Sequence, residues 1–201
     1  MSPRLGIFGG TFDPPHLGHL ILAAEAQAQL GLEKVLFVLT PQPPHKLDKQ
    51  ISALQDRLDL LHAAIRGQSI FELSTVEVER PGPHYTVDTL AQLAGLYPQH
   101  EFVYLIGGDS LEHLPSWHRP ADFLAACAAL GVMLRPGAQP DLAALEAALP
   151  GISAKLELVD APLLEISSSQ IRRRVREGGH FRFYLPGAVY ELILQRGLYR
   201  V

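Results

Sequence analysis

Strand, turn and helix follow one another in the stretch Leu5-Gly-Ile-Phe-Gly-Gly-Thr-Phe-Asp-Pro-Pro-His-Leu-Gly-His-Leu20. The apolar run Leu5–Phe8 is typical of a short buried strand, and the two glycines after it let the backbone turn sharply. Apolar residues then recur at helical spacing over residues 17–28, and Gly31 supplies the stop. We therefore expect a buried strand that leads through a tight turn into a helix.

The alternation of strand and helix continues to the end of the chain. Apolar runs predict further strands over Lys34–Leu39, Phe71–Val78, Phe102–Ile106, Leu130–Leu134 and Lys155–Val159. Helices are expected near residues 111 and 121 and over 52–65, 87–96, 141–148, 167–177 and 186–196, the first after the capping-box signature Ser52-Ala-Leu-Gln55. This alternation predicts the α/β class, with a doubly wound, Rossmann-like parallel sheet and helices on both faces. We expect a single domain over residues 1–201, with a small helical C-terminal portion from about residue 167 to residue 201.

The composition narrows the class of protein. Hydrophobic residues make up 47% and charged residues 19% of the 201 positions, as in a folded globular domain. The formal charge of −4 argues against binding to nucleic acid or to a membrane surface. Cys127 is the only cysteine, which excludes an internal disulfide and a cysteine-based zinc cluster. Because no apolar stretch is long enough for a membrane span or a signal sequence, we expect a cytoplasmic protein.

Sheets of this kind bind ligands beyond the carboxyl ends of their strands. Five loops are expected at that edge: Gly9–His16, Thr40–Lys46, Glu79–Thr86, Gly107–Trp117 and Asp160–Ser169. The most unusual residues of the chain lie in these loops. The functional residues are therefore expected there.

The first loop has the features of a phosphate site. Gly9 and Gly10 allow a ligand to approach the backbone closely, and the helix N-terminus behind them favours an anion. His16 and His19 are three residues apart, so both can project from one side of the first helical turn and donate to a phosphate. A tight turn with one capping and one packed histidine explains the spacing equally well. A zinc site would need further ligands, and the common Gly-x-x-x-x-Gly-Lys-Ser/Thr and Gly-x-Gly-x-x-Gly nucleotide motifs are absent.

Both ends of the chain carry motifs of one superfamily. The first loop, over Gly9-Gly-Thr-Phe-Asp-Pro-Pro-His-Leu-Gly-His19, resembles the extended His-x-Gly-His signature of the nucleotidylyltransferases. The segment Ile166-Ser-Ser-Ser-Gln-Ile-Arg172 resembles their second motif, Ile-Ser-Ser-Thr-x-Ile-Arg, with Ser169 at the usual threonine. The serines can cap a helix, and the arginine fork can reach a triphosphate. The alternative for this segment is an ordinary serine-rich helix start with a solvated basic face.

Three segments in the middle of the chain resemble bacterial nicotinate-nucleotide adenylyltransferases. They are Pro43-Pro-His-Lys46, Glu79-Arg-Pro-Gly-Pro-His-Tyr-Thr-Val-Asp-Thr-Leu90, and Leu105-Ile-Gly-Gly-Asp-Ser-Leu111 with Trp117 downstream. With the two terminal motifs, the resemblance runs from end to end. His84 stands where the family usually has serine, so we assign no role to this position.

The middle segments suit a pyridine carboxylic acid. Trp117 offers an indole face on which an electron-poor ring can stack, although a lone tryptophan can equally belong to a core or a surface. The helix start at Tyr85 and Thr86 offers N–H groups to a carboxylate. Asp109 can contact ribose hydroxyls or simply cap a helix. The Pro43–Lys46 segment either closes on the triphosphate or is a solvated linker.

The resemblance implies an enzyme that transfers the adenylyl group of ATP to nicotinate mononucleotide, with nicotinate adenine dinucleotide and pyrophosphate as products, in NAD biosynthesis. The expected catalytic residues are His16, His19, Lys46 and Arg172. ATP is expected at Gly9, Gly10, Thr11, Phe12, His16, His19, Gly107, Asp109, Ile166, Ser167, Ser168, Ser169 and Arg172. The mononucleotide is expected at Gly10, Thr11, Phe12, His45, Lys46, Tyr85, Thr86 and Trp117.

The resemblance also implies the cofactor and the partners. Mg²⁺ is expected, held mainly by the ATP phosphates and not by a protein metal site. ATP and nicotinate mononucleotide are the expected partners, without nucleic acid or membrane, and assembly into a homo-oligomer stays open. Three other functions stay open as well: a sister enzyme that uses nicotinamide mononucleotide or phosphopantetheine, a nucleotide-binding sensor without chemistry, and a tRNA-binding synthetase fragment. The charge of −4 argues against the last of these.

Overall fold

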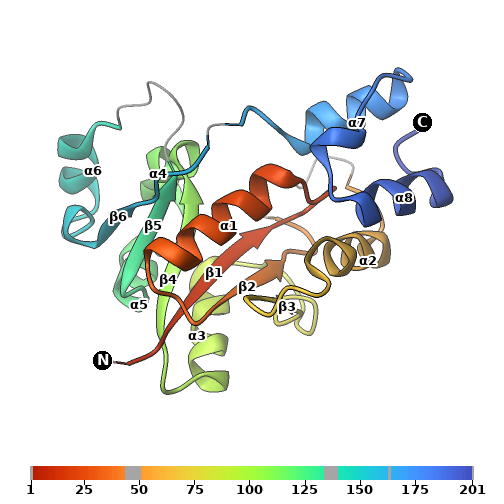
Figure 1. Cartoon of the computed structure of the whole chain (residues 1–201). Helices are drawn as coiled ribbons and strands as arrows, with labels where there is room; N and C mark the ends of the chain where they lie inside the picture. The colour runs from red at the N-terminus through yellow and green to blue at the C-terminus, as the bar shows by residue number, and fades with distance from the viewer. Residues whose placement is uncertain (1, 44–50, 134–139, 163, 201) are drawn as a thin grey trace.

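Six parallel strands form a central sheet in the computed structural model, which describes residues 2–43, 51–133, 140–162 and 164–200 (Figure 1). The strands are β1 (Arg4–Gly10), β2 (Lys34–Leu39), β3 (Phe71–Ser74), β4 (Glu101–Gly107), β5 (Ala129–Met133) and β6 (Leu156–Leu158). Their order across the sheet is β3-β2-β1-β4-β5-β6, and each neighbouring pair is parallel. The strand order therefore reverses between β1 and β4, which is where a doubly wound sheet offers a crevice to ligands.

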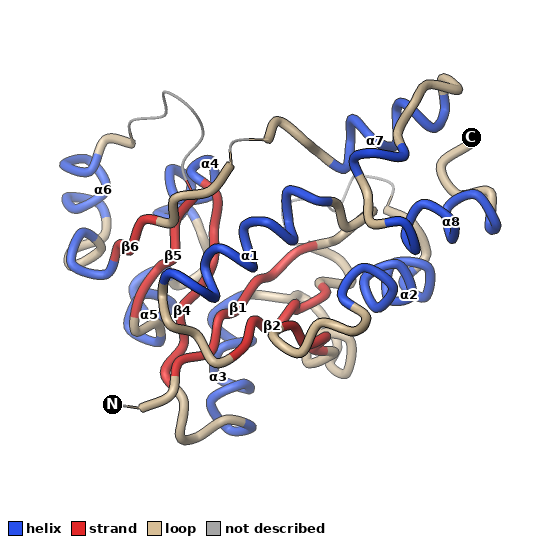
Figure 2. Tube along the Cα trace, in the orientation of Figure 1, coloured by secondary structure: helices blue, strands red, loops and turns tan. Residues whose placement is uncertain are grey.

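Helices cover both faces of the sheet, and Figure 2 shows how they alternate with the strands along the trace. The described residues form α1 (Leu17–Gln29), α2 (Leu54–Ile65), α3 (Thr86–Leu96), α4 (Gly108–His113), α5 (Pro120–Ala126), α6 (Leu142–Ala148), α7 (Ser168–Arg176) and α8 (Gly187–Arg196). One apolar cluster joins α1, α2, α7 and α8 to one face of the sheet, where Val35 and Phe37 of β2 lie. A second apolar cluster joins the helices α3, α4, α5 and α6 to the opposite face, where Leu36 and Val38 lie. Successive residues of a strand point to opposite faces, so this central strand is buried on both sides, and the predicted α/β doubly wound class is confirmed.

Most predicted elements lie where the sequence pattern put them, and two local predictions were wrong. The strand expected over Phe71–Val78 ends at Ser74, because its partner β2 is paired with it only up to Val38, opposite Ser74. The following residues form a turn, in which the Val78 N–H donates to the Thr75 carbonyl (2.7 Å). The capping box at Ser52 does not form either. Helix α2 begins at Leu54, and its N-cap makes no side-chain hydrogen bond.

The C-terminal helices pack into the core formed by the first half of the sheet. Ile171 of α7 and Val189 and Ile193 of α8 are fully buried in the same cluster as the β1 and β2 side chains. Helix α8 also contacts α2, and Arg196 forms ion pairs with Asp56 (2.8 Å) there. Segments at the two ends of the sequence therefore lie together over the carboxyl edge of β1 (Figure 1). No helix in the described ranges is long and apolar enough to cross a membrane.

Candidate active site

The loop between β1 and α1 is tightly folded. Phe12 lies in the left-handed region at φ 47°, and its ring is 2% exposed. The ring packs against Gly10, where an added Cβ would lie only 3.0 Å from it. Phe12 also contacts Phe8 and Phe37 edge-on or tilted, with ring centroids within 5.7 Å. Glycine and a buried aromatic ring thus fix the path of the backbone ahead of the helix.

His16 and His19 lie together at the start of α1. Their rings stack with centroids 3.6 Å apart, and the backbone N–H of His16 donates to Nδ1 of the His19 ring (3.1 Å). Because this Nδ1 accepts a hydrogen bond, a neutral His19 carries its hydrogen on Nε2, where it is a donor. His16 is only 6% exposed, and burial lowers its pKa to about 4. Its ring is therefore neutral at neutral pH.

Helix α7 is attached to the first loop by two side chains from its N-terminal half. The Ser168 hydroxyl donates to the Pro14 carbonyl (2.8 Å), and Nη1 of Arg172 donates to the Asp13 carbonyl (2.6 Å). The Ser167 hydroxyl caps the helix by accepting from the Gln170 N–H (3.2 Å). The two motifs at opposite ends of the sequence are thus in direct contact.

Asp13 joins this pair of motifs to two further segments. Its carboxylate is 4% exposed and accepts from the Tyr199 hydroxyl (2.8 Å) and the Ser52 N–H (3.2 Å). Burial and the neighbouring Asp13 charge raise the pKa of Tyr199, so the phenol keeps its proton and remains a donor. Asp13 and Tyr199 were not among the predicted site residues. The sequence signal for Asp13 was its place inside the first motif, whereas Tyr199 carried none.

A cleft of about 1080 Å³ opens at the carboxyl edge of the sheet, beside this cluster. The predicted residues that line it are Gly9, Gly10, Thr11, Tyr85, Thr86, Gly107, Asp109 and Trp117. They come from the carboxyl ends of β1 and β4, from the segments that follow these strands, and from the start of α3. The volume is that of a site for a sizeable ligand, and it lies where the strand order reverses.

Aromatic side chains from the start of α3 and from the segment after α4 form one wall of the cleft. Trp117 is half-buried and packs against Phe123 and Tyr104, with ring centroids 5.2 and 6.0 Å away. Tyr85 stacks on His118 with centroids 3.9 Å apart. Thr86 is the first residue of α3, so the N–H groups of that helix start beside this wall.

Three polar residues that line the cleft carried no assigned role. His84 is 8% exposed, and burial, followed by the Arg80 charge, lowers its pKa. Burial raises the pKa of Glu77, whose Oε1 accepts from the Thr89 hydroxyl (2.6 Å). Burial also raises the pKa of Tyr104, whose hydroxyl bonds the Thr86 side chain. Tyr104 and Glu77 lie in runs whose pattern predicts ordinary strands, so the pattern offered no reason to assign them a function.

Comparison with known proteins identifies the family. The cytidylyltransferase-like family matches residues 7–174. A probable nicotinate-nucleotide adenylyltransferase from Thermomicrobium roseum is 48% identical over 197 residues, which are 98% of this chain and 92% of that protein. One from Geobacillus kaustophilus is 42% identical over 196 residues, 98% of this chain and 86% of that protein. The chain belongs to the nicotinate-nucleotide adenylyltransferase family.

Solved structures agree with this family in fold. The nicotinic acid mononucleotide adenylyltransferase of Plasmodium falciparum, complexed with NaAD, superposes with a TM-score of 0.80 at 20% identity, and 98% of this chain and 97% of that chain are covered. A nicotinate-nucleotide adenylyltransferase structure from Vibrio parahaemolyticus, described as putative, gives 0.68 at 22% identity, with coverage of 98% and 96%. At these identities the likeness establishes the shared fold.

The family's motif residues fall into two groups around the cleft. The first group lines it, as described above. The second is not on the cleft wall and belongs to the first loop or to the starts of α1 and α7: Phe12, His16, His19, Ile166, Ser167, Ser168, Ser169 and Arg172. His45 and Lys46, both predicted to bind the mononucleotide, lie outside the described residues. In the described part of the chain, no three His, Cys, Asp or Glu side chains gather as metal ligands.

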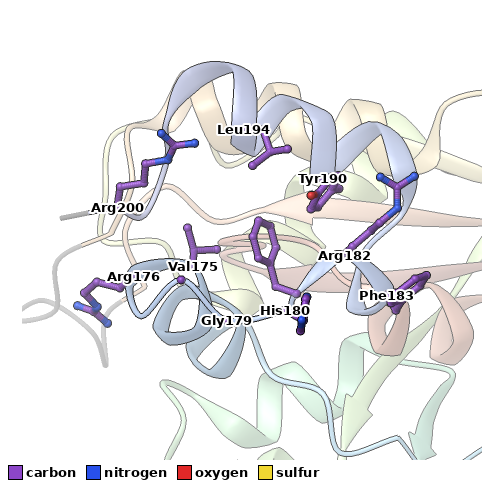
Figure 3. A pocket seen from close by; sticks show the side chains of 11 residues that line it. Val175, Arg176, Gly179, His180, Arg182, Phe183, Tyr190, Leu194 and Arg200 are labelled. Atoms are coloured by element: carbon purple, nitrogen blue, oxygen red, sulfur yellow. The ribbon is translucent and has the colours of Figure 1, made fainter.

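A second cavity, of about 640 Å³, lies between α7 and α8 (Figure 3). Arg176 and Arg200 stand on one side of it and Arg182 and Phe183 on the other. The Arg182 guanidinium lies 5.0 Å from the centre of the Tyr190 ring. Among the described family motif residues, none lines this cavity.

Proposed function

We propose that the chain transfers the adenylyl group of ATP to nicotinate mononucleotide and releases nicotinate adenine dinucleotide and pyrophosphate, in NAD biosynthesis. One observation carries the proposal: a single cleft joins the glycine loop before α1 to the aromatic wall at Tyr85 and Trp117. A reaction between two nucleotides needs a phosphate site and a base site within one cavity. The names of the relatives that cover nearly the whole chain support the same reaction.

The glycine-loop end suits the reacting phosphates. Gly10 and Thr11 line the cleft with backbone that a ligand can approach, and α1 begins six residues after Thr11. His16 is neutral at working pH, and His19 has its donor on Nε2, so both offer N–H groups to charge that builds up on a phosphate. Gly9, Phe12, Gly107 and Asp109 complete the proposed ATP contacts on this side.

The aromatic end suits the nicotinate ring. Trp117 supplies a face for stacking, and the N–H groups at Tyr85 and Thr86 point along the axis of α3, where the positive end of the helix dipole favours a carboxylate. The Tyr104 hydroxyl bonds the Thr86 side chain and so holds the start of α3 in place. His118 stacks on the Tyr85 ring and so helps to hold it at the cleft wall.

The chemistry is an in-line displacement at phosphorus. A phosphate oxygen of the mononucleotide attacks the α-phosphorus of ATP, and the bond from that phosphorus to the oxygen bridging to the β-phosphate breaks. The attacking phosphate is already an anion, so no strong base is required, and no covalent enzyme intermediate forms. The protein aligns the two phosphates and stabilises the charge on the leaving pyrophosphate.

Cationic side chains surround the leaving group in this scheme. Arg172 is held at the first loop by its bond to Asp13, and Ile166 and the serines 167–169 form the helix start around it. Lys46 and His45 are proposed to act from the second loop. Mg²⁺ would be held mainly by the ATP phosphates and would help to neutralise the charge on the leaving pyrophosphate. We propose that the enzyme works in the cytoplasm on these small molecules.

Pyrophosphate release tests the proposal. The purified chain is given ATP and Mg²⁺ with nicotinate mononucleotide, nicotinamide mononucleotide or phosphopantetheine in parallel. A preference of at least tenfold in kcat/KM for the nicotinate compound, about 1.4 kcal/mol, is expected. A preference for another acceptor would contradict the assignment of the aromatic wall, and release with none of the three would contradict adenylyl transfer to these acceptors.

A further inference from the structure

Arg57 is a charged residue in the middle of the apolar face of α2. The side chain is 2% exposed, although its neighbours on that face, such as Leu60 and Leu61, are core hydrophobics. It does not line the cleft, whereas Thr11 and Thr40 do, so it contacts the cleft-lining loops from inside the protein. Neither motif of the family contains it.

The buried guanidinium donates to four backbone carbonyls. Nη1 donates to Thr11 (3.2 Å) and to Thr40 (2.8 Å), Nη2 to Pro41 (2.7 Å) and Nε to Ser52 (3.1 Å). These acceptors belong to the loop after β1, the loop after β2 and the approach to α2, and the farthest of them, Thr11, is 46 residues from Arg57 in sequence. One side chain thus ties together three segments at the carboxyl edge of the sheet.

The energetics of this arrangement are unusual for an arginine. In the described residues, no carboxylate forms an ion pair with Arg57, and burial lowers its pKa, with Asp13 acting in the opposite direction. A buried cation without a paired anion is costly, and carbonyl acceptors offset the cost only while all of them stay in place. The loops and the guanidinium therefore hold each other in one geometry.

The bond to Thr11 also orients the next peptide group. In a trans peptide unit the carbonyl and the following N–H point in opposite directions. With the Thr11 carbonyl turned to Arg57, the Phe12 N–H points to the other side of the loop. Arg172 and Ser168 hold the carbonyls of Asp13 and Pro14 in the same loop, so the whole turn is anchored by side chains from α2 and α7.

We propose that Arg57 is a positioning residue for adenylyl transfer, which fixes the loop at Thr11 relative to the loop at Thr40 and Pro41 so that both present their groups to the two phosphates in one geometry. The inference rests on the proposed function for its catalytic consequence. Arg57 touches neither substrate in this assignment. It acts through the backbone of residues that do.

Paired substitutions test this role. Arg57→Lys keeps the charge but has no planar fork, and Arg57→Met keeps the apolar stem alone. The matched control is Lys155→Met, because Lys155 also donates to two carbonyls, those of Leu124 (2.7 Å) and Cys127 (2.6 Å), at the end of α5 away from the cleft. Each variant is assayed well below its Tm, and rates are divided by the folded fraction from circular dichroism.

A displacement of about 1 Å at a reacting group costs on the order of 100-fold in rate. We expect kcat per folded molecule to fall about 100-fold in Arg57→Met and about tenfold in Arg57→Lys, with the KM for the mononucleotide within threefold of wild type. Lys155→Met should keep kcat within twofold. Wild-type kcat per folded molecule in both Arg57 variants, or an equal loss in Lys155→Met, would overturn the proposal.

Amide hydrogen exchange of the free protein separates this inference from the proposed function. Faster exchange in peptides covering residues 9–13 and 38–42 is expected in both Arg57 variants and not in Lys155→Met. If these peptides exchange as in wild type, the positioning role is wrong, whatever the activity. If they loosen as expected but the wild-type chain transfers no adenylyl group, the proposed function fails and the catalytic role of Arg57 fails with it.

Discussion

Arg172 donates from Nη1 to the backbone carbonyl of Asp13 at 2.6 Å, and so joins the N-terminal half of α7 to the loop after β1 across 159 residues of sequence. Its Nη2 lies 3.4 Å from the Ser169 hydroxyl, and 31% of the side chain is exposed. The guanidinium has five N–H donors in a rigid fork. One edge of the fork can therefore hold the loop while another reaches a phosphate, which a lysine cannot do at both points.

Arg172→Met is accordingly expected to lower kcat about 100-fold and to raise the KM for ATP, because both the loop anchor and a phosphate donor are lost. Arg172→Lys should recover only part of the activity. Arg174→Met is the control on the same helix, since Arg174 lies over the Tyr184 ring at 5.0 Å and not at the first loop. Steady-state kinetics on the three variants measure kcat and the KM for ATP. An Arg172→Met enzyme with more than half of wild-type kcat would contradict the role.

His19 gives a second kinetic prediction. The bond from the His16 N–H to Nδ1 leaves Nε2 as the donor of His19, so His19→Ala removes an N–H from the reacting phosphates. We expect kcat to fall by about 100- to 1000-fold, the range seen when one donor to a developing charge is deleted. Thermal melts show whether the variant is folded, and His62→Ala, on the exposed side of α2, serves as the control. An unchanged kcat in a folded His19→Ala protein would rule out the transition-state role.

The sheet could be predicted because the strands have local signatures. Val35–Leu39 is apolar throughout, and this strand is buried on both faces as such a run requires. The length of β3 could not be predicted, since its pairing with β2 ends at Ser74, opposite Val38, and not where its own alternation ends. Ser52 was wrongly predicted to cap α2. In the fold, its N–H bonds Asp13 and its hydroxyl bonds Tyr199, so tertiary partners take the groups that a capping box would use.

The residues of the candidate site also differ in whether the sequence alone reveals them. The histidines and the serine motif are visible because their spacing within one short segment is distinctive. Arg57, Asp13 and Tyr199 act through contacts between segments far apart in sequence, and one chain alone does not show which segments meet. Arg57 had one usable signal, a charged residue at a position of α2 where the helical period requires an apolar one.

Stability should depend on pH through His16. Its pKa is about 4 in the folded protein and 6.5 in the unfolded chain, so the unfolded state takes up the proton first as the pH falls. The stabilisation is fully present above pH 6.5 and is lost as the pH falls toward 4, with a loss of about 2 kcal/mol at pH 5. The free energy of unfolding, measured with denaturant, should therefore differ less between pH 7 and pH 5 in His16→Gln than in wild type. His62→Gln, a surface change, should keep the wild-type difference, and an unaltered difference in His16→Gln would show that burial of His16 does not govern this dependence.

Trp117 gives the prediction most specific to the choice of substrate. The indole lines the cleft and packs with Phe123 at 5.2 Å, so it is held in place as one wall of the proposed nicotinate site. Trp117→Ala should raise the KM for the mononucleotide about 10- to 100-fold, because base stacking on an aromatic ring contributes about 1–3 kcal/mol, while the KM for ATP stays within threefold. Trp117→Phe keeps a smaller aromatic face, so its KM for the mononucleotide should lie between those of wild type and Trp117→Ala. Since loss of the contact with Phe123 also weakens the core, all assays are run well below the Tm of the least stable variant. Equal increases in both KM values would mean that Trp117 supports the cleft as a whole and does not stack on the pyridine ring.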